Sequence, residues 1–281
     1  MNDCLPNSIA LLLLLPFAGP LCAADTPPPG SPAAAESIQD NSFLMEEAYN
    51  QDAGVVQHIN TFQRDHASGD WLYTFTQEWP APTIKHQLSF TIPWQRLGGE
   101  RGAGDLLLNY RYQFLGDGDA KVAIAPRFSL IVPTGNEQRG LGGGGWGVQT
   151  NTALSLVATP HFNLHSNLGA TWTPRARDAA GGQAPTLSWN AGQSLIWLPH
   201  RRFNLLCEAV YARTETVSGP GQTERSASFF ISPGLRWSHN FSNGLQIVPG
   251  IAVPIGVGPS GGQHALFFYL SFEHPFRKLT P

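Results

Sequence analysis

The sequence predicts an all-β fold, a single closed antiparallel transmembrane β-barrel of about twelve strands with an N-terminal periplasmic extension. Three observations predict this fold: few charged residues, apolar and polar residues that alternate with a period of two, and connections that alternate between short and long. Charged residues make up 13% of the chain, about half the share of an average soluble domain. A mean hydropathy of -0.15 excludes a bundle of membrane helices.

The N-terminus is typical of an exported protein. An apolar run over residues 9–15 is followed by prolines and by small residues before Asp25, so residues 1–24 are expected to be a signal peptide. Residues 25–53 are expected to contain a Pro- and Ala-rich disordered linker and then a short helix over residues 37–50. That helix would stay in the periplasm or enter the lumen as a plug; an unattached leader strand is the alternative. The barrel is expected over residues 54–276, with a C-terminal tail over residues 277–281.

Composition limits the cofactors and partners. Cys4 and Cys22 fall in the expected signal peptide, so Cys207 alone remains, without an internal disulfide or a cysteine-based zinc site. The histidines form no tight ligand pair, and residues 141–147 lack the Lys and Ser/Thr of a phosphate-binding loop, so they predict a flexible surface loop. We expect no metal and no cofactor. A net charge of -3 argues against nucleic acid, so the expected partners are the lipid bilayer and a small-molecule solute, with the oligomeric state left open.

Segments of alternating polarity carry the strand prediction. In residues 104–114, Leu108 and Tyr110 share one parity while Asn109 and Arg111 share the other, so one face suits lipid and the other suits water. Similar segments give about twelve strands, beginning near Gly54, Asp70, His86, Gly104, Lys121, Gly147, Phe162, Thr186, Phe203, Ser226, Gly244 and Gln263. An even number returns both ends of the barrel to the same side.

Connections and aromatic residues support a location in the cell outer membrane. Short connections are expected at residues 116–120, 159–161, 199–202 and 239–243, and longer, Gly-richer ones at 95–103, 134–146, 174–185 and 217–225. This alternation is typical of periplasmic turns and extracellular loops. Tryptophans gather near the predicted strand ends, as in interfacial girdles, at Trp71, Trp79, Trp94, Trp146, Trp172, Trp197 and Trp237.

Strand parity also predicts an outer face. Apolar side chains on the lipid side should be exposed in the protein alone, namely Leu108, Tyr110, Ile124, Phe128, Leu168, Phe229 and Leu235. Four prolines fall inside predicted strands, where bulges or strand ends are expected because proline lacks a ladder donor; they are Pro93, Pro126, Pro233 and Pro249.

The opposite parity predicts the residues that line the lumen, which are Asp105, Asn109, Arg111, Arg127, His165, Glu208 and Arg236. Mixed charge inside a barrel either tunes what passes or forms a salt-bridge network that braces the wall. Arg111 and Arg127 lie on adjacent predicted strands, so Asp105 and Glu208 are the carboxylates expected beside them. Paired arginines would brace a narrow pore. Free arginines would form a basic constriction that favours anionic solutes such as aromatic acids.

A lipase-like outer-membrane hydrolase is the enzymatic alternative, and it needs a Ser and a His that meet on one face. His86 and Ser89 lie on opposite faces of one strand, and His264 and Ser271 are also of opposite parity. We therefore predict no catalytic residue and no enzyme. A non-transporting structural or adhesive barrel is the other alternative.

Three stretches resemble a known bacterial family. They are Phe43-Leu-Met-Glu-Glu-Ala-Tyr-Asn50 running into Gly54-Val-Val-Gln-His58, then Leu108-Asn-Tyr-Arg-Tyr112, and Ala125-Pro-Arg-Phe-Ser-Leu130 leading to Pro133-Thr-Gly135. Over most of the mature chain, the sequence resembles the transporter family of the MetA pathway of phenol degradation. The resemblance implies an outer-membrane pore or transporter for small solutes, aromatic or otherwise hydrophobic, and a family that accepts proline at Pro126. It supplies no functional residue, so every site residue above rests on strand parity.

Overall fold

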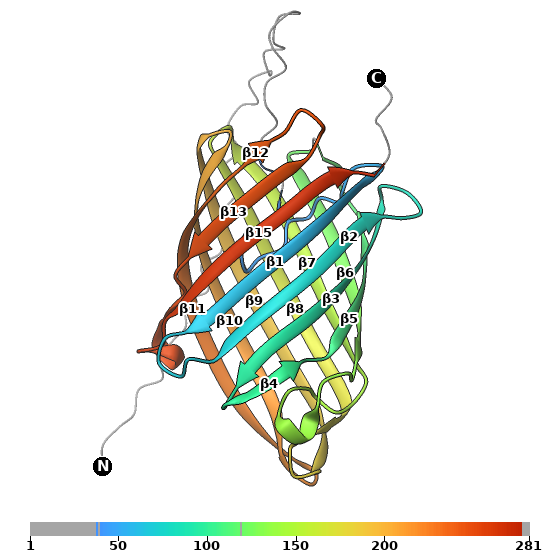
Figure 1. Ribbon diagram of the computed structural model, residues 1–281, viewed down its shortest axis with the longest axis vertical. Coiled ribbons are helices and arrows are strands. Elements are labelled where there is room, and N and C mark those ends of the chain that lie inside the picture. The colour runs from blue at the N-terminus through green and yellow to red at the C-terminus, as the bar shows by residue number, and fades with distance from the viewer. Residues whose placement is uncertain (1–37, 39, 119, 277–281) are drawn as a thin grey trace, which may run out of the picture. The chain divides into compact units, whose positions relative to one another are not determined.

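The computed structural model describes residue 38, residues 40–118 and residues 120–276. The expected signal peptide, the linker and the C-terminal tail lie outside these residues. Fifteen strand segments form one antiparallel sheet, which closes into a barrel of twelve strands and confirms the predicted fold class (Figure 1). Among the described residues, no helix is long and apolar enough to cross a membrane.

Twelve main strands follow one another around the wall, each antiparallel to the next. They are β1 (Val55–Asp65), β2 (Trp71–Pro80), β3 (His86–Leu97), β5 (Leu106–Tyr112), β6 (Val122–Val132), β7 (Gly147–Thr159), β8 (Phe162–Arg177), β9 (Gln183–His200), β10 (Phe203–Gly219), β11 (Gln222–Trp237), β13 (Gln246–Ala252) and β15 (Ala265–Pro275). Three short segments extend this set: β4 (Glu100–Ala103), β12 (His239–Asn240) and β14 (Ile255–Gly256). Pairing of β15 with β1 closes the barrel.

Both ends of the barrel wall lie on the same side, as predicted. Val55, the first residue of β1, pairs with Pro275, the last residue of β15. The same side carries the tight turns at residues 160–161 and 201–202, between β7 and β8 and between β9 and β10. An even number of strands produces this arrangement because each antiparallel step reverses the chain.

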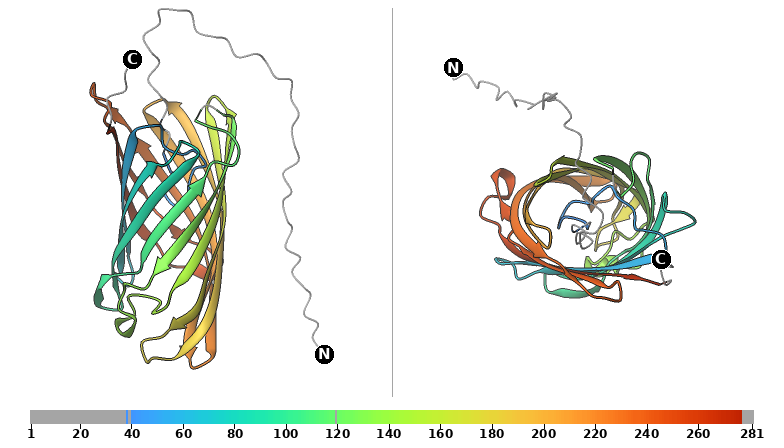
Figure 2. Two further views of the ribbon diagram at one scale, coloured as in Figure 1. Left: turned by 90° about the vertical axis from the view of Figure 1, so that its right-hand side faces the viewer. Right: turned by 90° about the horizontal axis from the view of Figure 1, so that it is seen from above.

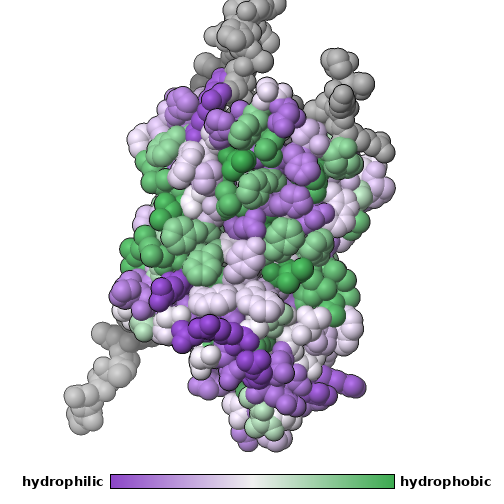
Figure 3. Space-filling model, viewed as in Figure 1, coloured by the Kyte–Doolittle hydropathy of each residue, from purple (hydrophilic) through white to green (hydrophobic). Residues whose placement is uncertain are grey.

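Apolar side chains face outward and polar ones face the lumen, which is the reverse of a soluble protein. Leu108, Tyr110, Phe128 and Leu168 are 45%, 40%, 49% and 63% exposed. Ile124, Phe229 and Leu235 are half-buried. In Figure 3 hydrophobic residues gather in a band across the middle of the face shown, with hydrophilic residues below it. Such a continuous apolar surface is suited to a lipid bilayer.

The four prolines lie where the backbone ladder is interrupted on one side. Pro93, Pro126, Pro233 and Pro249 each have a register partner on one neighbouring strand of the described barrel. For example, β11 and β13 pair only from Gly234, opposite Ala252, to Arg236, opposite Gly250. Pro233 and Pro249 directly precede the glycines at the two ends of this stretch. Since proline has no N–H, it is tolerated at such interruptions. At each proline, pairing with one neighbouring strand is therefore interrupted, while pairing with the other neighbouring strand continues.

Three of the four expected long loops are shorter than predicted. In residues 95–103, β3 continues to Leu97 and β4 begins at Glu100. In residues 174–185 and 217–225, β8 continues to Arg177, β9 begins at Gln183, and only residues 220–221 separate β10 from β11. The turn-forming residues in these regions occupy other positions: Pro174 lies at a register shift within β8, and Gly221 has the positive φ of a tight turn. The strands therefore extend well past the predicted loop boundaries.

Candidate functional site in the barrel lumen

The described residues that directly precede β1 lie inside the barrel. We call Asp40–Gln51 the luminal segment; Figure 2 shows it in blue within the ring of strands when the barrel is viewed along its length. None of its residues is exposed. It contains bends and no helical turn, so the expected short helix is wrong for these residues. Many of its N–H and C=O groups bond to side chains of the wall, and the N–H of Glu47 bonds to the side chain of Asn41 within the segment. These bonds explain how a non-helical segment can be buried.

Glu208 of β10 holds the middle of the luminal segment. One carboxylate oxygen accepts hydrogen bonds from the backbone N–H groups of Phe43, Leu44 and Met45 at 3.0–3.2 Å, and the other accepts from Leu44 at 3.1 Å. Consecutive N–H groups that converge on one anion form a nest. Glu208 is fully buried, so the charge that parity placed in the lumen serves to bind this backbone.

Arg236 of β11 and Asp40 fix the start of the luminal segment. Arg236 donates to the carbonyl oxygens of Asp40 and Asn41 at 2.8 and 2.6 Å. The Asp40 carboxylate accepts from Tyr269 and Ser271 of β15 and, at 2.9 Å, from the side chain of Gln57 in β1. The start of the segment is therefore tied to both sides of the β1–β15 closure.

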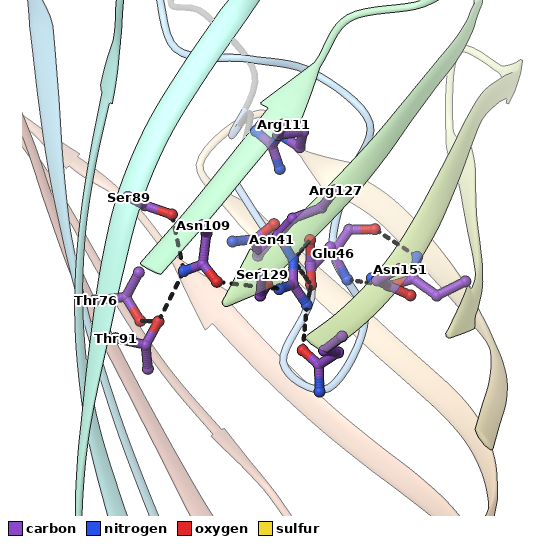
Figure 4. Close-up of polar contacts among 12 residues, drawn as sticks. Asn41, Glu46, Thr76, Ser89, Thr91, Asn109, Arg111, Arg127, Ser129 and Asn151 are labelled. Carbon is purple, nitrogen blue, oxygen red and sulfur yellow. Dashed lines mark hydrogen bonds and ion pairs between the residues drawn. The ribbon is translucent and has the colours of Figure 1, made fainter. Parts of the chain in front are cut away.

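Arg127 of β6 holds the tip of the luminal segment through a charge pair. Its guanidinium contacts the Glu46 carboxylate at 2.8–3.1 Å. It also donates to Asn109, Ser129 and Gln149, as Figure 4 shows for the cluster around Glu46. Each Arg127 nitrogen thus has a partner, so of the two alternatives the structure shows a paired arginine and not a free basic constriction.

Arg111 of β5 binds the returning half of the luminal segment. It donates to the carbonyl oxygens of Glu47 and Tyr49 at 3.2 and 2.6 Å, and to the Asn50 side chain at 2.9 Å. The prediction that Asp105 and Glu208 are the carboxylate partners of the two arginines is wrong. The prediction failed because it looked for partners within the wall, whereas the partners come from the chain before β1.

Asp105 has a different role from the one that parity predicted. Its two carboxylate oxygens accept from the backbone N–H groups of Gly135 and Gly143 at 2.9 and 2.7 Å. Leu141 in the same connection is buried, and its carbonyl oxygen accepts from Gln95. The connection between β6 and β7 is therefore held in place, and the expectation of a flexible loop at residues 141–147 is not supported by these contacts.

His165 lies in the lumen, as predicted, and meets a serine that the sequence did not single out. Its Nδ1 is 2.6 Å from Ser155 Oγ across the β7–β8 pair. Ser155 Oγ also accepts from the backbone N–H of Ala48 at 2.8 Å. Both side chains are buried. The short β7–β8 turn could have revealed the pair, because it fixes the register that places these two residues opposite each other.

The wall beside the segment's tip carries uncharged polar groups. Asn109 is buried in the lumen and accepts from Arg127. Asn109 also donates to Thr91 at 3.4 Å, and the Thr91 hydroxyl pairs with that of Thr76 at 2.8 Å. Between β1 and β2, the hydroxyls of Thr61 and Thr74 pair at 2.6 Å. These groups can exchange hydrogen bonds with a solute or with water without presenting a formal charge.

Acidic groups of the luminal segment differ in their electrostatic environment. Burial acts to raise the pKa of Glu46, but Arg127 holds this pKa below its ordinary value. Burial raises the pKa of Glu47 to about 8. The negative charges of Asp40 and Glu78 add to this rise, and the positive charges of Arg236 and Arg111 oppose it. Glu46 is thus held as an anion, whereas Glu47 favours the neutral form.

Within the described parts of the chain, no group of three or more His, Cys, Asp or Glu side chains could hold a metal ion.

An antiparallel barrel with an apolar outer face and a polar, partly filled lumen is a porin-like outer-membrane barrel. The sequence profile of the family described as "Putative MetA-pathway of phenol degradation" matches residues 35–270. The chain belongs to this family.

Solved structures of low sequence identity share the fold. The COG4313 outer membrane channel from Pseudomonas putida F1 has a TM-score of 0.58 and 13% identity, over 81% of this chain and 97% of that one. The NanC porin has a TM-score of 0.52 and 9% identity, over 77% of this chain and 98% of that one. No curated protein matches the chain. At these identities the likeness shows the fold alone.

Proposed function

We propose that the protein is an outer-membrane channel for small solutes and that the luminal segment sets the width of its lumen. One observation carries the proposal: a buried, non-helical segment is bound by side chains from many strands around the wall. The contacts come from β1, β3, β5, β6, β7, β8, β10, β11 and β15. Apolar contacts of Phe43 and Tyr49 add to this polar attachment. The wall strands pair with one another around the whole barrel, so the segment can leave without unfolding the barrel.

The solute class follows from which charged side chains of the lumen remain free to bind a solute. Arg111 and Arg127 are both engaged by the luminal segment, so the lumen offers no free basic constriction at these two residues for anionic aromatic acids. The hydroxyl and amide groups beside the tip favour uncharged solutes. Together with the family's association with phenol degradation, this supports small neutral solutes, aromatic ones among them. The proposal includes export by a signal peptide over residues 1–24.

The two alternatives account less well for the lumen. A hydrolase would use Ser155 and His165, but Ser155 Oγ is occupied by the Ala48 N–H and both side chains are buried beneath the segment. A purely structural barrel needs no segment bound through several charged side chains, since bracing could come from the wall alone.

Liposome swelling tests the proposal. Refolded protein in liposomes should admit small neutral solutes slowly and exclude larger ones, and Arg127→Ala should admit them faster. Arg139→Ala provides a matched control, because it removes an exposed pair with Glu100 outside the lumen. Swelling no faster than that of protein-free liposomes, in both wild type and Arg127→Ala, would contradict a channel and favour a structural barrel. Release of fatty acid from the liposomes would instead favour the hydrolase.

A further inference from the structure

Phe43 fills an apolar pocket on the inner wall. Its ring is 7% exposed and lies 5.6 Å, centroid to centroid, from the rings of both Phe267 and Tyr269 in β15. The ring belongs to an apolar cluster, although the rest of the lumen is largely polar. The cluster includes Ile59, Ile196, Leu206, Val248 and Ala252. The pocket is thus a distinct apolar site in the wall.

Two glycines leave space for the far edge of the Phe43 ring. A Cβ atom at Gly250 in β13 would lie 2.4 Å from Cε1 of Phe43, and a Cβ atom at Gly234 in β11 would lie 2.6 Å from its Cε2. Side chains at these inward positions would exclude the ring. The far edge of the Phe43 ring therefore lies against bare backbone, and the rings of Phe267 and Tyr269 lie beside it at interplanar angles of 44° and 48°. Contact with two aromatic rings favours an aromatic occupant over a saturated one.

Occupation of this pocket is coupled to the position of the luminal segment. The backbone N–H of Phe43 and those of the next two residues bond to Glu208. If the Phe43 ring leaves the pocket, these bonds are strained or lost, and the middle of the segment loses its attachment to β10. A molecule that competes for the pocket would therefore release the segment.

We propose that this pocket binds a small, neutral, monocyclic aromatic solute in exchange with Phe43, and that this exchange releases the luminal segment. The inference rests on the proposed channel function and names the solute class for the same lumen. Neutrality follows from the two buried carboxylates, Glu208 and Asp40, which lie at the adjoining stretch of the segment with one guanidinium, Arg236. An anionic ring would add a further negative charge to this buried group.

Ligand binding to the refolded full chain in nanodiscs tests the exchange directly. The probe is 4-fluorophenol, followed by ¹⁹F NMR, with benzoate and cyclohexanol as unlabelled competitors. Phe43→Ala empties the pocket and should bind the probe at least about tenfold more tightly than wild type, because the competing ring no longer reduces the fraction of available sites. The matched control is Phe43→Ala with Gly250→Val, in which a side chain refills the pocket. Phenol should displace the probe, and benzoate and cyclohexanol should not.

Equal affinity of Phe43→Ala and of the double variant would overturn the proposal, because the probe would then bind elsewhere or only partition into lipid. A second measurement needs no variant: phenol should accelerate hydrogen exchange of the amides of residues 43–45 in the wild-type chain, and unchanged exchange at saturating phenol would also overturn it. Binding is measured without transport. Loss of swelling with intact probe binding would therefore count against the channel function, and the reverse result against this inference.

Discussion

Arg127 and Glu46 are joined at 2.8–3.1 Å although they are 81 residues apart in the sequence. One belongs to the wall and the other to the luminal segment, and both side chains are largely shielded, at 14% and 27% exposed. A shielded charge is retained at low cost only when it is paired and hydrogen-bonded. This pair therefore fixes where the tip of the segment lies, and its removal should be felt first in the segment and not in the barrel.

The first prediction concerns this pair. Arg127→Ala leaves Glu46 without its cation and should weaken docking of the segment by at most about 3–5 kcal/mol, the range for a broken buried pair. Maleimide labelling of Met45→Cys, in a Cys207→Ser background, measures the exposure of the tip. Labelling should become faster by tenfold or more, while Arg139→Ala leaves it unchanged. A rate equal to that of the parent would show that Arg127 does not hold the segment.

The second prediction concerns Glu208. Glu208→Ala leaves the N–H groups of Phe43, Leu44 and Met45 without an acceptor, at a cost of about 1–3 kcal/mol for each buried group left unsatisfied. Hydrogen exchange of residues 43–45 should accelerate strongly. Glu208→Gln keeps one acceptor oxygen and should have a smaller effect. If Ala and Gln variants exchange at the wild-type rate, the nest does not stabilise the segment.

The sequence predicted the wall better than what fills it. Period-two alternation placed Arg111, Arg127 and Glu208 in the lumen because each strand position determines the side-chain direction. Their partners could not be found in this way, since Glu46 and the backbone of residues 43–50 reach them across tens of residues with no regular period. The loop errors have a local cause: Pro174 and neighbouring glycines are turn formers, but here they occupy a strand irregularity and tight turns.

The third prediction concerns pH. Because the pKa of Glu47 is raised to about 8 in the docked segment, docking is strongest below the ordinary pKa of 4.5 and weakens as the pH rises through about 8. Labelling of Met45→Cys, corrected for the pH dependence of maleimide chemistry with a free thiol, should therefore accelerate from pH ~6 to ~9. Glu47→Gln should flatten this rise. The same pH profile in both variants would rule out Glu47 as its source.

The fourth prediction concerns the connection between β6 and β7. Asp105→Ala removes the acceptors of Gly135 and Gly143, so residues 133–146 should become sensitive to limited proteolysis. Glu100→Ala removes only the exposed pair with Arg139 in the same region and should change little. Segment labelling should be unaffected in both. A connection that stays resistant in Asp105→Ala would show that other contacts suffice to hold it.

Single-channel conductance in planar bilayers tests the central claim most directly. The full chain should be compared with a chain refolded from Asp52 onward, which keeps all of β1 to β15 and lacks the luminal segment. We predict a small conductance for the full chain and a several-fold larger one for the shortened chain, because removal of Asp40–Gln51 empties the part of the lumen that it occupies. Equal conductance of the two, with both barrels folded, would contradict the account that the luminal segment sets the width of the channel.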